Sequence, residues 1–389
     1  MKAGYKPCSL GSVAKVIAGQ SPEGKYYNDK GEGLPFYQGK KEFGERVIGE
    51  PTTWTTDVTK IGEPGDILMS VRAPVGPVNF TDQKICIGRG LAAIRSSETI
   101  DSDFLYYQLL SKQDEIAGTE GAVFASINKA AIEALQVVVP AIEEQRRIVT
   151  LLDEAFADIA TAKANAEKNL QNARALCEGL MQSLFPEDDN VAEDAPALDT
   201  LCELIVDCEH KTAPTQENGV PSIRTPNIGK GRLLLDGVYR VSDETYTEWT
   251  RRAEPQGGDL ILAREAPAGN VAVIPDGMKV CLGQRTVLIR PKKSVFVPAY
   301  LAQLLLRQNS QRRLLAHSRG ATVQHINMKD IRAFKIGAIP TLADQQRIVS
   351  QVNELFDTED RLVSIYHQKL TALDDLKKSL LHQAFSGQL

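Results

Sequence analysis

The sequence predicts an α/β (α+β) fold in two tandem copies, in which each copy is a globular domain followed by a long helix. The two helices are expected to pair as an antiparallel coiled coil. Three observations support this prediction: an internal repeat, a heptad pattern in each copy, and short strand-like runs in the globular parts. Because a repeated sequence indicates a repeated structural unit, a pattern found in one copy is expected in the other.

The repeat consists of five matched segments whose separation grows along the chain. They are Leu10 with Leu201, GDILMSVRAPVG (65–76) with GDLILAREAPAG (258–269), ICIGRGLAAIR (85–95) with VCLGQRTVLIR (280–290), GAVFASIN (121–128) with GATVQHIN (320–327), and PAIEEQRRIV (140–149) with PTLADQQRIV (340–349). The offset rises from 191 to 200 residues and then stays at 200 as far as Phe185 and Phe385. Loops absorb insertions, whereas an added residue rotates everything beyond it in a helix. Each copy is therefore a variable domain followed by a helix of fixed length.

A heptad pattern follows Pro140 and Pro340. The seam positions are Leu152, Phe156, Ile159, Lys163, Ala166, Leu170, Ala173, Cys177, Leu180 and Leu184 in the first copy, and Val352, Phe356, Glu359, Val363, Tyr366, Leu370, Leu373, Lys377, Leu380 and Ala384 in the second. Steps of three and four with few polar exceptions are typical of a coiled coil. Each helix of roughly 40 residues would be about 60 Å long. The simplest way to cover both seams is antiparallel pairing between two halves related by a pseudo-twofold axis.

The repeat and the helices divide the chain into five segments. They are a first domain (1–140), a first long helix (141–185), an acidic linker PEDDNVAEDAPA (186–197), a second domain (198–340) and a second long helix (341–389). The linker is predicted from its charge, its prolines and its lack of aromatic residues.

Within each domain, the patterns predict strands alternating with short helices. The runs GDILMSV, ICIGRGLAAIR, DLILAR and VAVIP favour strands, and residues 104–116 and 299–315 favour amphipathic helices. Asn128 and Asn327 are expected to cap short helices that begin at the next residue. A last strand, LQVVVP in one copy and FKIGAIP in the other, should lead into the long helix.

The net charge of −5 is unevenly distributed. Residues 197–340 carry a net charge of +6, residues 141–196 carry −7, and the two remaining segments carry −2 each. The second domain is therefore a candidate for binding a polyanion. The first domain would need a local basic patch to do the same.

The composition argues against a membrane, a secreted or a metal-binding protein. No run of about 20 apolar residues occurs, and the start MKAGYKPCSLGSVAKVI lacks the apolar stretch of a secretory signal. The six cysteines form no CxxC pair, which fits the reducing cytoplasm. Cys202 and Cys208 lie near His210, but their spacing is poor for zinc, and no metal site is predicted.

The sequence also lacks the motifs of catalysis and cofactor binding. GLPFYQGKK (33–41) does not have the glycine spacing or the hydroxyl residue of a phosphate-binding loop. HExxH, GxSxG, GxGxxG and the Asn/Asp-Pro-Pro-aromatic motif of adenine methyltransferases are all absent. Asp66 and Asp259 recur after glycine, a pattern more typical of turn residues than of metal ligands. We therefore expect a non-catalytic chain that binds no cofactor itself.

The layout resembles the specificity subunit of type I restriction–modification systems over essentially the whole chain. The resemblance rests on the two variable domains, the EEQRRIV and ADQQRIV segments, the GAVFASIN and GATVQHIN loops and the ending KKSLLHQAFSGQL. It implies that the globular domains are target recognition domains, similar to the recognition domain of certain adenine methyltransferases. Each would read one half of a split target in double-stranded DNA, and the helices would set the unread spacer.

The resemblance also implies partners. Two modification subunits would bind S-adenosylmethionine and methylate adenine at N6. Two restriction subunits would use ATP and Mg²⁺ to translocate and cleave the DNA.

Base reading requires Arg, Lys, Gln, Asn or hydroxyl side chains on loops that reach a DNA groove. The candidates are Tyr37, Gln38, Lys40, Lys41, Arg72, Arg89 and Ser126 in the first domain, and Arg224, Asn227, Lys230, Arg232, Arg264, Arg285, Gln324 and His325 in the second. Each could instead be a solvated charge or make a structural hydrogen bond. Arg147 and Arg347, at the helix starts, are better suited to the domain–helix junction or to partner binding.

Two other classes of function are open. A bifunctional restriction enzyme would need nuclease and methyltransferase modules, whose motifs this sequence lacks. A scaffold with a coiled-coil stalk explains the helices, but it does not explain two domains with matched loops or the segment of charge +6.

Overall fold

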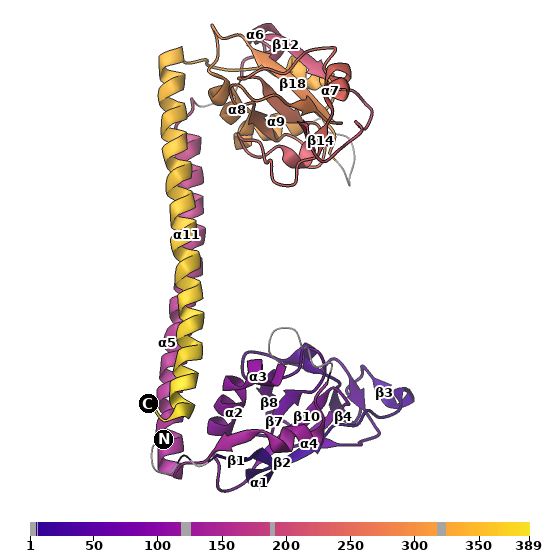
Figure 1. Cartoon of the computed structure of the whole chain (residues 1–389), viewed down its shortest axis with the longest axis vertical. Helices are drawn as coiled ribbons and strands as arrows, with labels where there is room; N and C mark the ends of the chain where they lie inside the picture. The colour runs from indigo at the N-terminus through magenta and orange to yellow at the C-terminus, as the bar shows by residue number, and fades with distance from the viewer. Residues whose placement is uncertain (1–4, 6, 118–125, 187–190, 317–323) are drawn as a thin grey trace. The chain divides into compact units, whose positions relative to one another are not determined.

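The computed structural model describes Tyr5 and residues 7–117, 126–186, 191–316 and 324–389. The chain forms two compact units. Unit 1 contains Met1–Lys168 and Tyr366–Leu389, and unit 2 contains Asn169–Ile365. Each unit holds one globular domain together with the adjoining part of both long helices (Figure 1).

The domain of unit 1 is built on two main sheets. Their strands are β2 (Ala14–Ala18), β3 (Tyr27–Asn28), β4 (Leu34–Tyr37), β5 (Trp54–Thr55), β6 (Ile61–Gly62), β7 (Ile67–Ser70), β8 (Val78–Phe80), β9 (Ile85–Ile87) and β10 (Leu91–Ser96). One sheet has the order β2–β10–β7–β8 and the other β3–β5–β4–β9–β6. Every residue of β7 and β9 is buried, which explains why their sequences are apolar except for Ser70 at the end of β7. A separate pair joins β1 (Pro7–Ser9) to β11 (Gln136–Val138).

The domain of unit 2 repeats this plan. Its strands are β12 (Cys202–Asp207), β13 (Val220–Ile223), β14 (Arg240–Val241), β15 (Leu260–Ala263), β16 (Val271–Val273), β17 (Cys281–Leu282) and β18 (Thr286–Pro291). The sheets have the orders β12–β18–β15–β16 and β14–β13–β17. The runs predicted as strands from the repeat are confirmed in both domains. FKIGAIP is the exception: Lys335 makes a single bridge to Ala197, and no strand forms there.

Short helices cover the sheets. In unit 1 they are α1 (Leu10–Val13), α2 (Ser102–Ser111), α3 (Gln113–Ala117) and α4 (Lys129–Ala134), and in unit 2 α6 (Leu198–Leu201), α7 (Asp243–Trp249), α8 (Pro298–Leu306), α9 (Gln308–Leu315) and α10 (Met328–Ala333). Single turns of 3₁₀ helix occur at Gly24–Tyr26, Lys40–Glu42 and Thr225–Asn227. The two predicted amphipathic helices are present, each divided into a consecutive pair.

The two predicted helix caps differ. The Asn128 Oδ1 atom accepts a hydrogen bond from the Ala131 N–H at 2.9 Å, which confirms the predicted cap of α4. Asn327 occupies the same position before α10 but makes no side-chain cap. Its Nδ2 donates to Asp330 at 3.1 Å instead. The predicted capping hydrogen bond of Asn327 is therefore wrong, because its carboxamide bonds the carboxylate of Asp330 instead.

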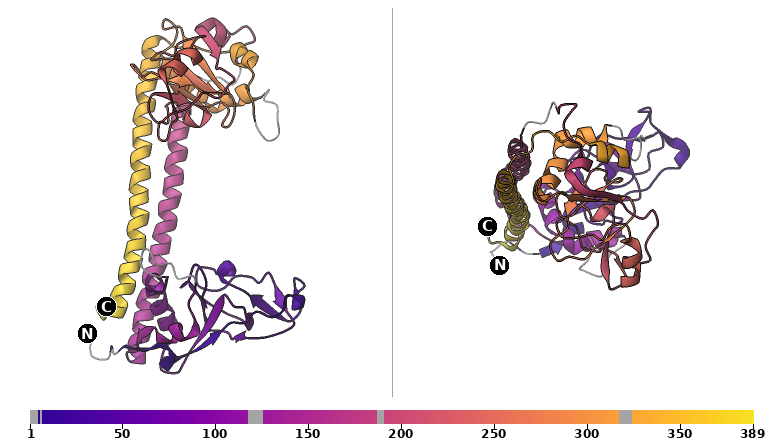
Figure 2. Two further views of the ribbon diagram at one scale, coloured as in Figure 1. Left: turned by 45° about the vertical axis from the view of Figure 1, so that its right-hand side comes forward. Right: turned by 90° about the horizontal axis from the view of Figure 1, so that it is seen from above.

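The two long helices are α5 (Ile142–Ser183) and α11 (Leu342–Ser386). In unit 1, the N-terminal part of α5 lies beside the C-terminal part of α11, as Figures 1 and 2 both show. Leu152 and Leu381 are buried in the same core, and the Lys163 Nζ atom lies 2.7 Å from a carboxylate oxygen of Asp374. The helices therefore run antiparallel in this unit, as predicted.

In unit 2 the opposite helix ends meet. Phe185, just beyond α5, shares a core with Val349 and Val352 of α11. Leu180 departs from the predicted seam and is 44% exposed, because the neighbouring Leu184 and Phe185 pack toward the domain instead. Apart from this last turn, the α5 seam is buried or partly buried.

A buried glutamine at the start of each long helix attaches it to a domain. Gln145 is 0% exposed. Its Oε1 accepts from the Asp101 N–H at 2.8 Å, and its Nε2 donates to the carbonyls of Thr99 and Pro140 at 3.1 and 2.8 Å. Because Asp101 is the N-cap residue of α2, the hydrogen bond from Asp101 to Gln145 fixes α2 against α5.

The equivalent residue of unit 2, Gln345, is also 0% exposed. Its Oε1 accepts from the Val297 N–H at 2.8 Å, and its Nε2 donates to the carbonyls of Val295 and Pro340 at 2.8 and 2.9 Å. The two residues occupy matched positions in EEQRRIV and ADQQRIV. We call Gln145 and Gln345 the helix-start glutamines.

In each unit, the domain helix that the helix-start glutamine holds also contacts the end of the other long helix. The Phe385 ring lies 5.3 Å from Phe104 of α2, and the Phe185 ring lies 5.3 Å from Tyr300 of α8. These rings also occupy equivalent positions, so one arrangement of contacts holds each domain on the start of one long helix and the end of the other.

An additional charged contact occurs in unit 1. Arg46 donates to Asp103 at 2.6 Å and to Asp153 of α5 at 2.7 Å, and its guanidinium lies over the ring of Tyr107. Burial opposes the charge of Arg46, but the hydrogen bonds to Asp153 and Asp103 outweigh it and raise its pKa. The position equivalent to Asp153 is Asn353, so this ion pair is not repeated in unit 2.

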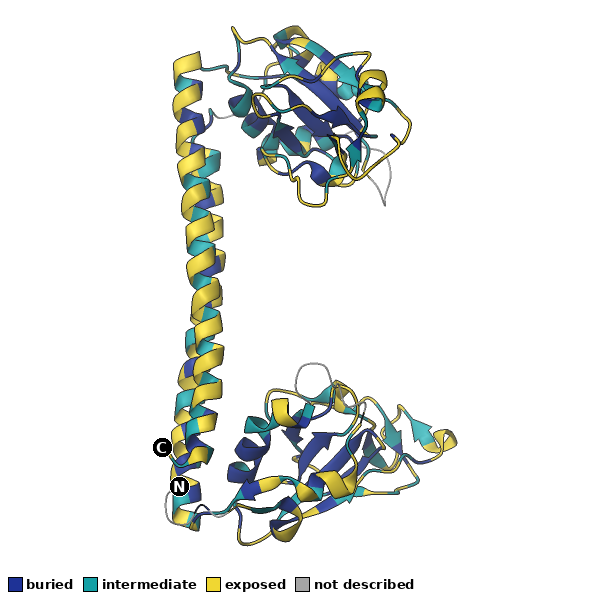
Figure 3. Ribbon diagram, in the orientation of Figure 1, coloured by how far each residue is buried: buried dark blue, intermediate teal, exposed yellow. Residues whose placement is uncertain are grey.

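Burial follows the sheets, whose central strands are enclosed while the connecting loops and the outer helix faces are exposed (Figure 3). Of the helices in the described ranges, none combines the length and apolar character needed to cross a membrane.

Candidate nucleic-acid interface

Four segments of unit 1 lie side by side where strands end. The Gly90 N–H donates to the Gln38 carbonyl at 3.0 Å, the Val71 N–H to the Gly90 carbonyl at 2.9 Å, and the Ile127 N–H to the Val71 carbonyl at 3.0 Å. We call residues 38, 71–72, 88–90 and 126–127 the strand-end ledge of unit 1. Backbone hydrogen bonds therefore bring together segments that are far apart in the sequence.

Unit 2 forms the same ledge from equivalent elements. The Gly283 N–H donates to the Ile223 carbonyl at 2.8 Å, the Arg264 N–H to the Arg285 carbonyl at 2.8 Å, and the Ile326 N–H to the Arg264 carbonyl at 3.0 Å. The strand-end ledge of unit 2 comprises residues 224, 264–265, 283–285 and 325–326.

Eight of the predicted DNA contacts lie on these ledges. They are Gln38, Arg72, Arg89 and Ser126 in unit 1, and Arg224, Arg264, Arg285 and His325 in unit 2. Except for Arg264 and the half-buried His325, their side chains are exposed. Gln324 is exposed and directly precedes the unit 2 ledge. Residues 121–125 and 320–323 of the two glycine loops lie outside the described residues.

Arg264 is a structural residue rather than an exposed contact. Its side chain is 10% exposed. It donates to Asp207 at 2.6 Å and to the Ile326 carbonyl at 2.9 Å, and it lies 3.0 Å from His325 Nε2. A structural role for Arg264 therefore replaces the prediction that it reads a base. Its guanidinium N–H groups already bond buried partners and cannot also donate a pair of hydrogen bonds to DNA.

The other ring nitrogen of His325 is also occupied. Its Nδ1 lies 2.7 Å from Glu265, and Glu265 pairs with Arg285 at 2.8 Å. This chain of side-chain contacts links His325 to the strand ends. The corresponding bridge in unit 1 joins Arg72 to Ser126, whose side chains carry no such acid.

Two further predicted contacts are buried. The Tyr37 side chain is 0% exposed, and its hydroxyl donates to the Gly49 carbonyl at 2.9 Å. Burial and nearby carboxylates raise its pKa to about 12. Asn227 is 8% exposed; its Nδ2 donates to the Leu234 carbonyl at 3.2 Å, and its Oδ1 accepts from the Arg224 N–H at 3.2 Å. Both side chains hold backbone in place instead of projecting toward a base, which corrects the prediction.

The remaining candidates lie outside the ledges. Lys40 and Lys41 are exposed on the 3₁₀ turn that follows β4. Lys230 and Arg232 are exposed on a hairpin whose Gly231 N–H donates to the Val271 carbonyl at 2.8 Å. Contact of these residues with DNA stays a prediction.

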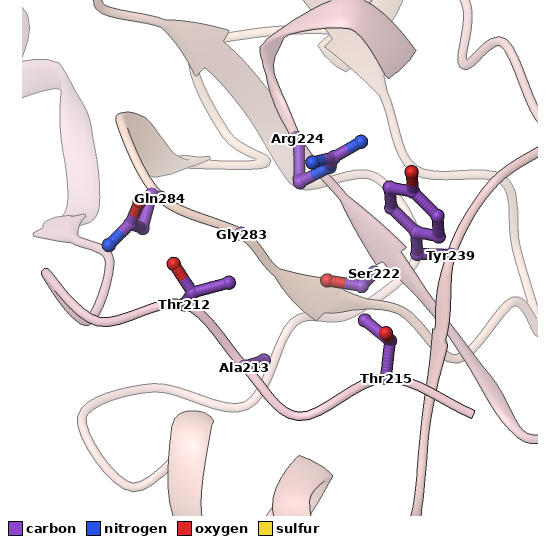
Figure 4. A pocket seen from close by; sticks show the side chains of 8 residues that line it. All are labelled: Thr212, Ala213, Thr215, Ser222, Arg224, Tyr239, Gly283 and Gln284. Carbon is purple, nitrogen blue, oxygen red and sulfur yellow. The ribbon is translucent and has the colours of Figure 1, made fainter.

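A pocket that the sequence did not reveal opens beside the ledge of unit 2. It has a volume of about 170 Å³ and is lined by Thr212, Ala213, Thr215, Ser222, Arg224, Tyr239, Gly283 and Gln284 (Figure 4). Its polar groups come from four separate segments, and 208–253 has no matched segment in the repeat. Of the residues that line the pocket, only Arg224 was among the candidates singled out from the sequence.

Asp207, Cys208 and His210 place potential metal-ligating atoms within 4.8 Å of one another. Asp207 is already paired with the Arg264 cation at 2.6 Å. Burial raises the pKa of the Cys208 thiol and so disfavours the thiolate that a metal needs. Both features oppose a cation here, and Cys202 lies at the far end of β12.

The two recurring aspartates have the same structural role. Asp66 pairs with Arg95, and Asp259 pairs with Arg290, each at 2.8 Å, and each carboxylate is 2% exposed. In each aspartate the Oδ2 atom also accepts a hydrogen bond from the backbone N–H of the residue three positions earlier. These contacts confirm the interpretation as turn residues.

Comparison with known proteins gives a consistent result. Residues 2–170 and 208–370 match the family described as type I restriction modification DNA specificity domain. The MjaX type I restriction enzyme specificity subunit of Methanocaldococcus jannaschii is 42% identical over 163 residues, which cover 41% of this chain and 38% of that protein. The EcoBI specificity subunit of Escherichia coli is 20% identical over 98% of this chain and 85% of its own length.

A solved structure shares the fold. A chain in a structure of a type I restriction–modification system superposes with a TM-score of 0.79 at 17% identity, over 100% of this chain and 99% of its own. The family match covers well over half of the sequence and includes both domains. The chain therefore belongs to the family of type I restriction–modification DNA specificity domains.

Proposed function

We propose that this chain is the DNA-reading subunit of a type I restriction–modification complex and that it recognises a split target in double-stranded DNA. The observation that carries the proposal is the pair of strand-end ledges, which have the same backbone construction but different side chains. Gln38 and Arg89 in unit 1 stand where unit 2 has Arg224 and Gln284. Two readers of equal build and unlike side chains suit two half-sites of different sequence.

The chemistry belongs to the partners in this proposal. Modification subunits use S-adenosylmethionine to methylate adenine at N6, and restriction subunits use ATP and Mg²⁺ to translocate and cleave DNA. The relatives are named specificity subunits, in keeping with a recognition role for this chain. All six cysteines are free thiols, which supports a location in the reducing cytoplasm.

We infer two modification subunits per chain from a repeated apolar feature of the long helices. Leu176 of α5 is 64% exposed, and Leu376, its equivalent in α11, is 47% exposed. Leucines this exposed at matched positions suit two equivalent docking sites for copies of one partner.

The Leu176→Glu and Leu376→Glu variants test this stoichiometry. We expect each single variant to retain one modification subunit and the double variant to retain none, because a charge at the centre of an apolar contact is left without solvent or partner. Native mass spectrometry of the purified complex measures the number bound. Leu151→Glu, at a 40% exposed leucine of α5 whose equivalent is the polar Gln351, is the matched control. Two subunits on each single variant would contradict the proposal.

A genome-wide map of N6-methyladenine tests the function itself. A host that expresses this chain with its cognate modification subunit is compared with one that expresses the modification subunit alone. We expect a methylated motif only in the first host, composed of two short half-sites separated by a gap of fixed length. A continuous motif, or none from an assembled and active complex, would favour the scaffold alternative.

A further inference from the structure

The structure reveals an equivalence between Gln38 and Arg224 that the sequence repeat does not contain. Gln38 is the first residue after β4, and Arg224 is the first after β13. Both strands pair in parallel with the strand of the repeated ICIG or VCLG segment. The repeated glycine, Gly88 or Gly283, then donates its N–H to the last residue of the strand at 2.8 Å in both units. The two residues therefore leave the sheet at the same point.

The glycine at this point lets the backbone pass close to the reading residue. A Cβ atom added at Gly283 would lie 2.5 Å from Cγ of Arg224, and one added at Gly88 would lie 2.9 Å from Cα of Gln38. Neither distance is compatible with a real side chain. The backbone at Gly88 or Gly283 therefore packs directly against the residue that follows the strand, Gln38 or Arg224.

Tyr239 holds the guanidinium of Arg224. The Ser222 N–H donates to the Tyr239 carbonyl at 2.7 Å, so Tyr239 stands opposite Ser222, and Arg224, two residues further, shares that face. The guanidinium carbon lies 4.2 Å from the centre of the Tyr239 ring (Figure 4). A cation over an aromatic ring loses part of its rotational freedom before it binds.

Both side chains are available for a ligand. Arg224 and Gln38 are exposed, and within the described part of the chain no residue hydrogen-bonds the guanidinium of Arg224 or the carboxamide of Gln38. The pocket beside Arg224, about 170 Å³, is smaller than the roughly 300–1,000 Å³ of small-molecule sites. Hydroxyls of Thr212, Thr215 and Ser222 line it. Such a space suits the edge of one base better than a complete cofactor.

We propose that Gln38 and Arg224 are equivalent base-reading positions, and that Arg224 reads a guanine in one half-site while Gln38 reads an adenine in the other. An arginine fork donates two hydrogen bonds to O6 and N7 of guanine, and a glutamine carboxamide bonds N6 and N7 of adenine in the major groove. The assignment rests on the proposed function and adds the base that one residue in each half-site requires.

Methylation maps of Arg224→Ala, Arg224→Gln and Gln38→Arg in the complete complex test the assignment. We expect Arg224→Ala to lose the guanine requirement at one position of one half-site, with discrimination falling roughly tenfold to a hundredfold. Arg224→Gln should replace that guanine with adenine, and Gln38→Arg should replace an adenine with guanine in the other half-site. Tyr239→Leu should weaken discrimination at the Arg224 position alone.

The controls separate the alternatives. Arg251→Ala removes an exposed arginine of the same unit, whose Nε donates to the Glu248 carbonyl, and should leave the motif unchanged. An unaltered second half-site in each variant shows that the complex is folded and active. Arg224→Ala overturns the proposal if methylation falls equally at all sites with the motif intact, as for a phosphate contact, or if nothing changes. Failure of the wild-type complex to give a split motif would instead reject the proposed function.

Discussion

Deleting one heptad from each long helix is expected to shorten the unread spacer of the target by about three base pairs. Seven residues correspond to about 10 Å of helix at 1.5 Å per residue, and a base pair rises about 3.4 Å. Removal of residues 165–171 from α5 and 365–371 from α11 preserves the seam, because seven residues are one full repeat of a coiled coil. The expectation depends on the proposal that the helices act as the spacer between the two readers.

The methylation map of the deletion variant measures this directly. Both half-sites should keep their sequences, and only the gap should change, so the enzyme complex acquires a new target without any change in a reading residue. Deletion of four residues at the same places is the matched control, since it breaks the heptad register and should abolish methylation. If the seven-residue variant methylated the original motif, the helices would not determine the spacing.

Replacing a helix-start glutamine by leucine is expected to destabilise one unit and spare the other. Gln145→Leu leaves the Asp101 N–H and two carbonyls without partners, and Gln345→Leu does the same around Val297. Buried groups that lose their hydrogen bonds cost about 1–3 kcal/mol each, so we expect a loss of roughly 2–4 kcal/mol per variant after partial relaxation.

Hydrogen exchange shows which unit is affected. The amide of Asp101 should exchange at least about 30-fold faster in Gln145→Leu, and that of Val297 should do so in Gln345→Leu, since each 1.4 kcal/mol is a factor of ten. Gln171→Leu and Gln351→Leu, at exposed glutamines of the same helices, should leave these rates unchanged. Equal acceleration in both units would show that the residues do not attach their domains independently.

The elements that the sequence predicted best are those with a local or periodic cause. A helix such as α5 shows its seam in steps of three and four because each residue advances by a fixed rotation. The constant offset of 200 over the helices, against a growing offset over the domains, separated rigid from tolerant parts without any coordinates. The same periodicity wrongly placed Leu180 on the seam, because its neighbours Leu184 and Phe185 pack into the domain core and Leu180 is left exposed.

The sequence named candidate contacts one by one, and the structure brings eight of them onto the two strand-end ledges, because equivalent strands end at the same edge. Their contact with DNA stays a prediction. Burial was not visible from the sequence: Arg264 and Asn227 are as polar as Arg224, but Arg264 is enclosed by acceptors from distant segments and Asn227 bonds the backbone of its own loop. The partner Tyr239 was missed because it lies in residues 208–253, for which the sequence repeat has no matched segment, and it reaches Arg224 across a strand pairing.

The sequence by itself determined that the chain has two similar halves, that each ends in a long helix, and that the layout resembles a type I specificity subunit. The first two conclusions depend on patterns along the chain, and these patterns do not depend on which individual side chains are buried. Only the tertiary structure decided that Gln38 and Arg224 are equivalent, and that Tyr37 and Arg264 are structural. The physical reason is that exposure and hydrogen-bond partners are set by backbone pairings between segments far apart in the sequence, such as Gln38 with Gly90 and Arg264 with Ile326.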